Sequence, residues 1–151
     1  MKQERLIVSG FINMRVESVG GDLQVVGWER MEVQARTDGD VLTLAAEEQT
    51  IRAGCPGDLI LYLPREANLQ IMSVAGDADL RALTGSVQVQ SVGGDLQMRN
   101  VGAVDAGNVG GDLSVRSCVG GLSARSVGGD ASLRDIHGAV MIVAGADLYF
   151  R

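Results

Sequence analysis

Short stretches of alternating apolar and polar residues run through the chain, separated by turns rich in glycine. From residue 68 onward each stretch follows the pattern G-x-Φ-x-Φ-x-x-Φ-x, where Φ is apolar, and the turns recur every eight to ten residues. Alternation with a period of two is typical of strands with one buried face. So short a unit holds one strand and one corner, with no room for a helix.

A longer repeat of 17 or 18 residues lies over the short one. Asp77, Asp95, Asp112, Asp130 and Asp147 recur at this spacing, and an arginine follows each of them by four residues. The intervening units carry neither residue, so two units form one coil. The pattern predicts an all-β fold, a parallel β-solenoid with two strand-bearing faces and coils stacked about 4.8 Å apart.

The Φ positions are predicted to point inward and stack as ladders, because a single coil cannot bury its apolar face alone. One sheet would contribute Leu80, Leu96 or Met98, Leu113, Val115 and Leu133. The other sheet would contribute Val87, Val89, Val104, Ala106, Leu122, Ala124, Val140 and Ile142.

Residues 1–67 are less regular, but their alternation is also that of strands. We expect one domain over residues 1–151, with irregular N-terminal coils in 1–67 and the regular repeat in 68–151. "TDGD" at 37–40 predicts a hairpin-like turn, and Pro64 predicts the end of a strand. Residues 44–53 are the only candidate for a helix.

Composition narrows the classes of function. The 151 residues carry a net charge of −6, which disfavours binding to a nucleic acid duplex. The N-terminus lacks the apolar core of a signal peptide, and no stretch is apolar for long enough to span a membrane. These features predict a cytoplasmic protein, or an envelope-associated one if the chain is a fragment.

Residues for catalysis or metal binding are sparse, and we predict no enzyme activity, no metal and no cofactor. His137 is the only histidine, and Cys55 and Cys118 stand alone. Cys55 is expected in a loop as the more reactive thiol, and Cys118 as a small buried residue at a corner. Trp28 is expected to cap the end of the core.

The "VGGD" turns resemble calcium-binding repeats in their nine-residue period. Each turn offers at most one aspartate, whereas calcium takes six to eight oxygen ligands. The alternative interpretation is that each aspartate accepts a hydrogen bond within its own turn.

One face of the predicted solenoid carries a column of arginines, which are Arg81, Arg99, Arg116, Arg134 and Arg151. At strand spacing these guanidinium groups repel one another unless they are neutralised, so the column is a candidate site for a polyanion or an acidic partner. The aspartates lie about 13 Å away along the strand, too far for direct pairing. The alternative is a solvated face without a partner.

The other face is nearly neutral and flat, which favours packing on a second sheet. Candidate residues for self-association on this face are Gln88, Gln90, Ser123 and Met141. Tyr149 and Phe150 either plug the end of the solenoid or lie at a bare end that stacks on another copy. Both surfaces predict a homo-oligomer.

The order "DLILYLP", "SVAGD" and "SVGGD" within residues 57–137 resembles a bacterial adhesin-like β-repeat domain of unknown function. The resemblance implies a single-stranded β-solenoid and a non-enzymatic role, and it implies no catalytic residues. The chain is more distantly similar to bactofilins, which are cytoskeletal β-solenoids that polymerise end to end.

The sequence therefore predicts a non-enzymatic scaffold that self-associates through the solenoid ends or the neutral face. The alternative is a binding module whose arginine column binds a polyanion or an acidic cell-envelope partner. Salt distinguishes the two, because polyanion binding weakens steeply as salt rises.

Overall fold

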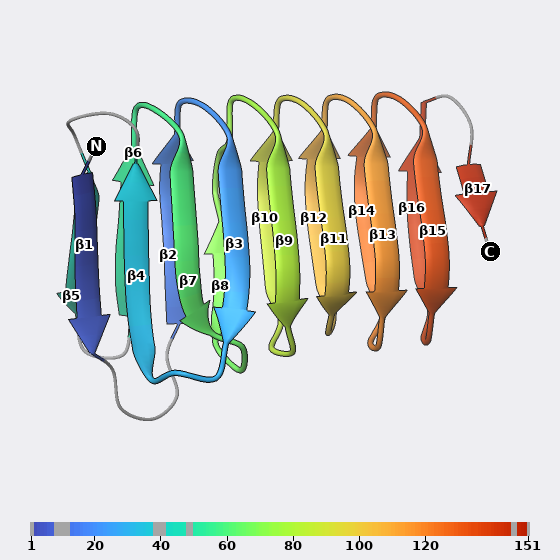
Figure 1. Ribbon diagram of the computed structural model, residues 1–151. Coiled ribbons are helices and arrows are strands. Elements are labelled where there is room, and N and C mark those ends of the chain that lie inside the picture. The colour runs from blue at the N-terminus through green and yellow to red at the C-terminus, as the bar shows by residue number, and fades with distance from the viewer. Residues whose placement is uncertain (1, 8–12, 38–41, 48–49, 146–147, 151) are drawn as a thin grey trace.

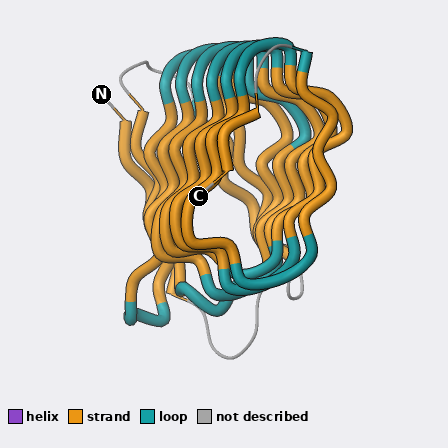
Figure 2. The backbone as a smooth tube through the Cα atoms, turned by 90° about the vertical axis from the view of Figure 1, so that its right-hand side faces the viewer, coloured by secondary structure: helices purple, strands orange, loops and turns teal. Residues whose placement is uncertain are grey.

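The computed structural model describes residues 2–7, 13–37, 42–47, 50–145 and 148–150, and every regular element in these ranges is a strand. The strands form two sheets that face each other across one core (Figure 1). Seen end-on, successive coils superimpose and enclose that core between two walls (Figure 2). The prediction of an all-β solenoid with two strand-bearing faces is confirmed.

The sheets are called sheet A and sheet B. Sheet A contains, in spatial order, β1 (Lys2–Ile7), β4 (Glu32–Thr37), β7 (Leu59–Pro64), β3 (Leu23–Trp28), β9 (Ala78–Leu83), β11 (Leu96–Val101), β13 (Leu113–Cys118), β15 (Ala131–Ile136) and β17 (Leu148–Phe150). Sheet B contains β16 (Val140–Ala144), β14 (Leu122–Val127), β12 (Val104–Val109), β10 (Val87–Val92), β8 (Asn68–Ile71), β2 (Asn13–Val19), β6 (Thr50–Cys55) and β5 (Thr43–Glu47).

From β8 onward the strands pair in parallel, and equivalent residues of successive coils lie side by side. Val87 pairs with Val104, 17 residues later, and Val104 pairs with Leu122, 18 residues later. In sheet A, Leu96 pairs with Leu113. The chain repeats its sequence because each coil must present the same shape to the next.

The inward ladders predicted from the pattern form the core. In sheet A the predicted positions are all buried, and Leu96 and Met98 both point inward. In sheet B the ladder is buried as far as Ala124, whereas Val140 and Ile142 of β16 are only partly buried. This difference arises because β16 is an edge strand with a neighbour on one side only.

The N-terminal part departs from a simple stack, because its coils do not follow the order of the sequence. The coil made by β2 and β3 lies between the coil of β6 and β7 and the coil of β8 and β9. Between β3 and β6 the chain forms β4, antiparallel to β1 and β7, and β5, antiparallel to β6. These antiparallel strands lie at one end of the solenoid (Figure 1).

Three local predictions fall in this part. The helical candidate at 44–53 is wrong: these residues belong to β5 and β6, and residues 48–49 lie outside the described ranges. Pro64 ends β7 as predicted. Most of the 37–40 turn lies outside the described residues, and the strands on either side of it belong to different sheets.

Each regular strand of sheet A bends at one residue in the left-handed region. Ala82, Asn100, Ser117 and Asp135 have φ values of 56°, 53°, 63° and 55° and directly follow the four described arginines of the column. The bend breaks the alternation, so that Arg99 and Asn100 both point outward before Val101 returns to the core.

Candidate binding face

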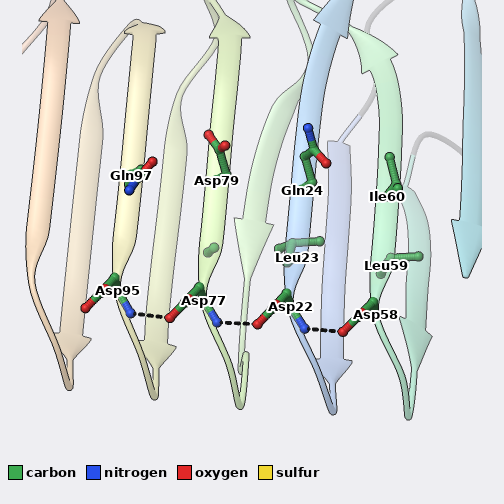
Figure 3. Close-up of a pocket in the computed structure, with 11 residues that line it drawn as sticks. Asp22, Leu23, Gln24, Asp58, Leu59, Ile60, Asp77, Asp79, Asp95 and Gln97 are labelled. Atoms are coloured by element: carbon green, nitrogen blue, oxygen red, sulfur yellow. Dashed lines mark hydrogen bonds between the residues drawn. The ribbon is translucent and has the colours of Figure 1, made fainter. Parts of the chain in front are cut away.

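Aspartates at the start of the sheet A strands link one coil to the next (Figure 3). The backbone N–H of Asp95 donates a hydrogen bond of 2.8 Å to Oδ1 of Asp77. The N–H of Asp112 likewise donates one of 2.8 Å to Oδ1 of Asp95. We call this series the aspartate ladder; its members are Asp58, Asp22, Asp77, Asp95, Asp112 and Asp130. The interpretation that each aspartate accepts a hydrogen bond in its own turn is wrong, because the N–H groups that donate to Asp22, Asp77, Asp95 and Asp112 belong to the adjacent coil.

The glycines of the "VGGD" turns make room for this ladder. A Cβ on Gly94 would overlap Oδ1 of Asp77, and a Cβ on Gly111 would overlap Oδ1 of Asp95. The preceding glycine has a different neighbour, since a Cβ on Gly110 would overlap the carbonyl oxygen of Gly93. In the turns with two glycines, the second thus makes room for the carboxylate and the first for the backbone of the previous coil, although Ala75 occupies the first position in the turn before β9.

Four of the five predicted arginines form one column on the outer face of sheet A. Arg81, Arg99, Arg116 and Arg134 pair in register on β9, β11, β13 and β15, and all are exposed. Arg81 forms an ion pair of 3.1 Å with Asp79. The other three have no acidic partner in the part of the chain that the structure describes. Arg151 lies outside that part.

A polar column separates the arginines from the aspartate ladder. Asp95 directly precedes β11, and Gln97 and Arg99 follow within the strand; Gln97 pairs in register with Ser114. The neighbouring coils place Gln24, Asp79 and Ser132 in the same column. Over β9, β11, β13 and β15 the outer face of sheet A thus carries three parallel columns: acidic, mostly neutral, and basic.

Two grooves follow the aspartate ladder. The first, of about 410 Å³, lies over β7, β3, β9 and β11, between the ladder and residues such as Gln24 and Gln97 (Figure 3). The second, of about 320 Å³, continues over β13 and β15, where Ser114 and Ser132 form its other side. Asp95 and Gln97 line both grooves, so the two grooves adjoin along the face. Sequence reasoning missed these grooves because they depend on how the coils stack.

The outer face of sheet B carries the other predicted residues. Gln88, Ser123 and Met141 lie in one register column on β10, β14 and β16, and Gln90 is exposed on β10. The side chains of Met141 and Val143 are 73% and 63% exposed. Tyr149 and Phe150 pair through their backbone with β15, and their side chains lie outside what the structure describes.

The two thiols are buried. Cys55 ends β6 and its Sγ donates to the carbonyl oxygen of Gly57 at 3.3 Å, so the prediction of a reactive loop cysteine is wrong. The Sγ of Cys118 donates to the carbonyl oxygen of Gly102 at 2.9 Å, one coil earlier. Burial raises the pKa of the Cys118 thiol above its ordinary value. The prediction that Cys118 is a small buried residue at a corner is confirmed.

Trp28 does not cap the end of the core. It lies on the outer side of β3, where its ring stacks on Tyr62 of β7 with 5.1 Å between the centroids. The guanidinium of Arg30 lies 5.2 Å from the ring centroid, and Nε1 donates to the carbonyl oxygen of Glu32. The prediction is wrong because the coil of β2 and β3 lies between two others.

The other candidates form no centre of their own. His137 is exposed at a corner, and its backbone N–H donates to the carbonyl oxygen of Cys118. Over the described ranges, no three His, Cys, Asp or Glu side chains are placed to hold a metal ion together. Nor do these ranges contain a helix of the length and apolarity needed to cross a membrane.

Comparison with known proteins finds similarity to solved structures only. No protein-family model matches the sequence, and neither does any curated protein. A "putative cell adhesion protein" from Clostridium sporogenes shares 11% identity and a TM-score of 0.39, with 99% of each chain covered. A "putative adhesin" from Bacteroides fragilis shares 10% identity and a TM-score of 0.29, with 99% of this chain and 96% of that one covered.

A third structure, a "putative adhesin" from Parabacteroides merdae, shares 8% identity and a TM-score of 0.28 over 99% of this chain and 95% of that one. These names are of the same adhesin-like kind as the family that the sequence resembles. At such low scores the likeness supports no inference about what this chain binds.

Proposed function

We propose that the chain is a non-enzymatic scaffold that self-associates. The observation that carries the proposal is the repetition of the same outward side chains in register over successive coils, as in the column from Arg81 to Arg134. A periodic face offers many equivalent weak contacts side by side, which suits association over an extended area. Catalysis instead needs different groups that converge on one reacting atom.

The acidic groove supports a structural role for its carboxylates. Asp22, Asp77 and Asp95 each use Oδ1 to accept a backbone N–H of the adjacent coil. The groove over β7, β3, β9 and β11 is further lined by Asp58, by Asp79, which forms an ion pair with Arg81, and by leucine, isoleucine, alanine and glutamine side chains. None of these lining residues carries a hydroxyl, thiol, imidazole or amine that could act as a nucleophile. The role that we assign to these aspartates is to link successive coils through hydrogen bonds.

Self-association through sheet B or through the ends remains the prediction made from the sequence. On sheet B the contact would include Gln88, Gln90, Ser123 and Met141, and the exposed apolar side chains of Met141 and Val143 support a partner there. At the end of the solenoid it would include Tyr149 and Phe150 of β17.

Light scattering after size exclusion, over a series of protein concentrations, tests the proposal. The monomer has a mass of 15.8 kDa, and we expect a mass of twice that value or more that grows with concentration. A mass that stays at 15.8 kDa up to the highest concentration would overturn it.

The arginine column carries a second candidate function, which is binding of a polyanion or an acidic partner. Arg99, Arg116 and Arg134 support it, because none of them has an acidic partner among the described residues. Polyphosphate is a suitable probe, titrated at two salt concentrations. Binding that weakens with salt and is lost in Arg116→Glu, but retained in Arg125→Glu on sheet B, supports this function; no binding at low salt excludes it.

A further inference from the structure

We infer that the outer face of sheet A binds the same face of a second copy of the chain. In this dimer the aspartate ladder of each copy lies opposite the arginine column of the other. The inference rests on the proposed self-association and names its surface, one that differs from sheet B and from the ends.

The three columns make this face complementary to itself. Asp95, Gln97 and Arg99 follow one another at two-residue steps, so the acidic and basic columns run parallel, about 13 Å apart, with the polar column midway. Consider a two-fold axis that runs along the polar column, between the two faces. Rotation about this axis places one face on the other, exchanges the acidic and basic sides, and leaves each coil at the same position along the solenoid. Every acidic position then meets a basic one.

The proposed aspartate–arginine pairs between the two copies repeat at the same spacing over four coils. Arg99 would lie opposite the partner's Asp95, and Arg116 opposite the partner's Asp112. Arg81 and Arg134 would meet the corresponding aspartates of their own coils in the same way. Because both columns repeat at the same inter-strand distance, about 4.8 Å, one register satisfies all pairs together.

The grooves supply the space for this contact. They follow the aspartate ladder with volumes of about 410 and 320 Å³, so arginine side chains from a second face can enter them. The Oδ1 atoms of Asp77, Asp95 and Asp112 accept backbone N–H groups. Their Oδ2 atoms have no partner among the described residues and can accept from a guanidinium.

The middle column allows the two faces to approach. Gln97, Ser114 and Ser132 are uncharged, and the serines are small. Asp79 is the one acidic residue described in this column, and it is paired with Arg81 of its own chain. Within the four coils that carry the arginine column, like charges at the axis are thus confined to one coil and are partly neutralised there; farther along the sheet, Arg36 of β4 lies in the same register column.

The charged part of the face is the centre of the proposed contact. The four strands that carry the arginine column, at about 4.8 Å each and six residues of about 3.3 Å, cover roughly 380 Å², so the contact must extend over neighbouring strands of sheet A to reach the ~800 Å² that each partner buries in a standard interface. A polyanion fits this face less well, since the carboxylates of the ladder lie beside the arginines and repel it. A second copy matches both columns at once.

Cross-linking with a short bis-maleimide tests the arrangement. Ser114 lies on the proposed axis, so in Ser114→Cys the two new thiols face each other, whereas Ser123→Cys on sheet B is the matched control. Cys55 and Cys118 are buried and give little background. We expect a covalent dimer from Ser114→Cys and none from Ser123→Cys. A dimer from Ser123→Cys alone overturns the inference and leaves the self-association intact.

Charge reversal gives an independent readout that does not need the new cysteine. In Arg116→Glu each copy of the chain places a new carboxylate opposite the aspartate ladder of the other copy. Because this repulsion occurs twice in a two-fold dimer, we expect the dimer dissociation constant to rise about tenfold or more. Arg125→Glu makes the same change on sheet B and should leave the constant unaltered. Equal effects of both variants overturn the inference. A wild-type chain that stays monomeric overturns the proposed function itself.

Discussion

The backbone N–H of Asp112 donates a 2.8 Å hydrogen bond to the carboxylate of Asp95, which lies one coil earlier in the solenoid. The same bond joins Asp95 to Asp77 and Asp130 to Asp112. A side chain thus satisfies a backbone donor at the corner that leads into each of these sheet A strands, outside the strand pairing itself. This relationship explains why the repeat carries an aspartate directly after its glycines.

Replacement of Asp95 by alanine removes the acceptor for the N–H of Asp112. We expect Asp95→Ala to lower the free energy of unfolding by about 1–2 kcal/mol, because a backbone donor at a corner loses a charge-assisted hydrogen bond. Asp95→Asn keeps an oxygen acceptor and should lose less than half of that. Urea denaturation followed by circular dichroism measures both, and equal losses in the two variants would contradict the ladder.

Gly111 makes room for the carboxylate of Asp95. Gly111→Ala should destabilise the protein by about 1–3 kcal/mol, because the new methyl group overlaps Oδ1 of Asp95. Gly121→Ala is the matched control, since its Cβ would find only the carbonyl oxygen of Ala139, at 3.4 Å. A comparison of the thermal midpoints tests the prediction, which fails if both variants melt together.

Ala82 occupies the left-handed region without being a glycine. Ala82→Gly should stabilise the protein by about 0.5–1 kcal/mol, because the relief of the positive φ outweighs the extra entropy of the unfolded chain. At Ala103, which is exposed and has no positive φ, the same change should destabilise by about 0.5 kcal/mol. We therefore expect the urea midpoint to rise in Ala82→Gly and to fall in Ala103→Gly. A loss at both positions would show that the bend is unstrained.

Cys118 makes stability depend on pH in the alkaline range. Burial raises the pKa of its thiol in the folded state, so the unfolded chain releases this proton at a lower pH. The free energy of unfolding should therefore fall as pH rises above the ordinary thiol pKa of about 8.5. Cys118→Ala removes this contribution, and its stability should fall less over the same interval. Parallel curves for the two proteins would contradict it.

The regular half of the fold could be predicted from the sequence because its constraint is local. Each coil must match the next in length and side-chain direction, so the spacing from Asp95 to Asp112 and the alternation around Leu96 already define the stack. The inward ladders and the arginine column follow from the same rule.

The order of the N-terminal coils could not be predicted in this way. The strands β3 and β7 carry similar alternation, and nothing local to either states that β3 lies between β7 and β9. The position of Trp28 depends on this order. The hydrogen-bond partner of each aspartate likewise depends on coil stacking, since a carboxylate at a corner can reach its own turn or the next coil.

The most direct test of the central claim is sedimentation equilibrium of the wild-type chain at low and high salt. If two copies associate through the aspartate and arginine columns of sheet A, the dimer should form at low salt and weaken steadily as salt screens the facing charges. A mass of 15.8 kDa at every concentration, or a dimer whose stability does not change with salt, would contradict the account.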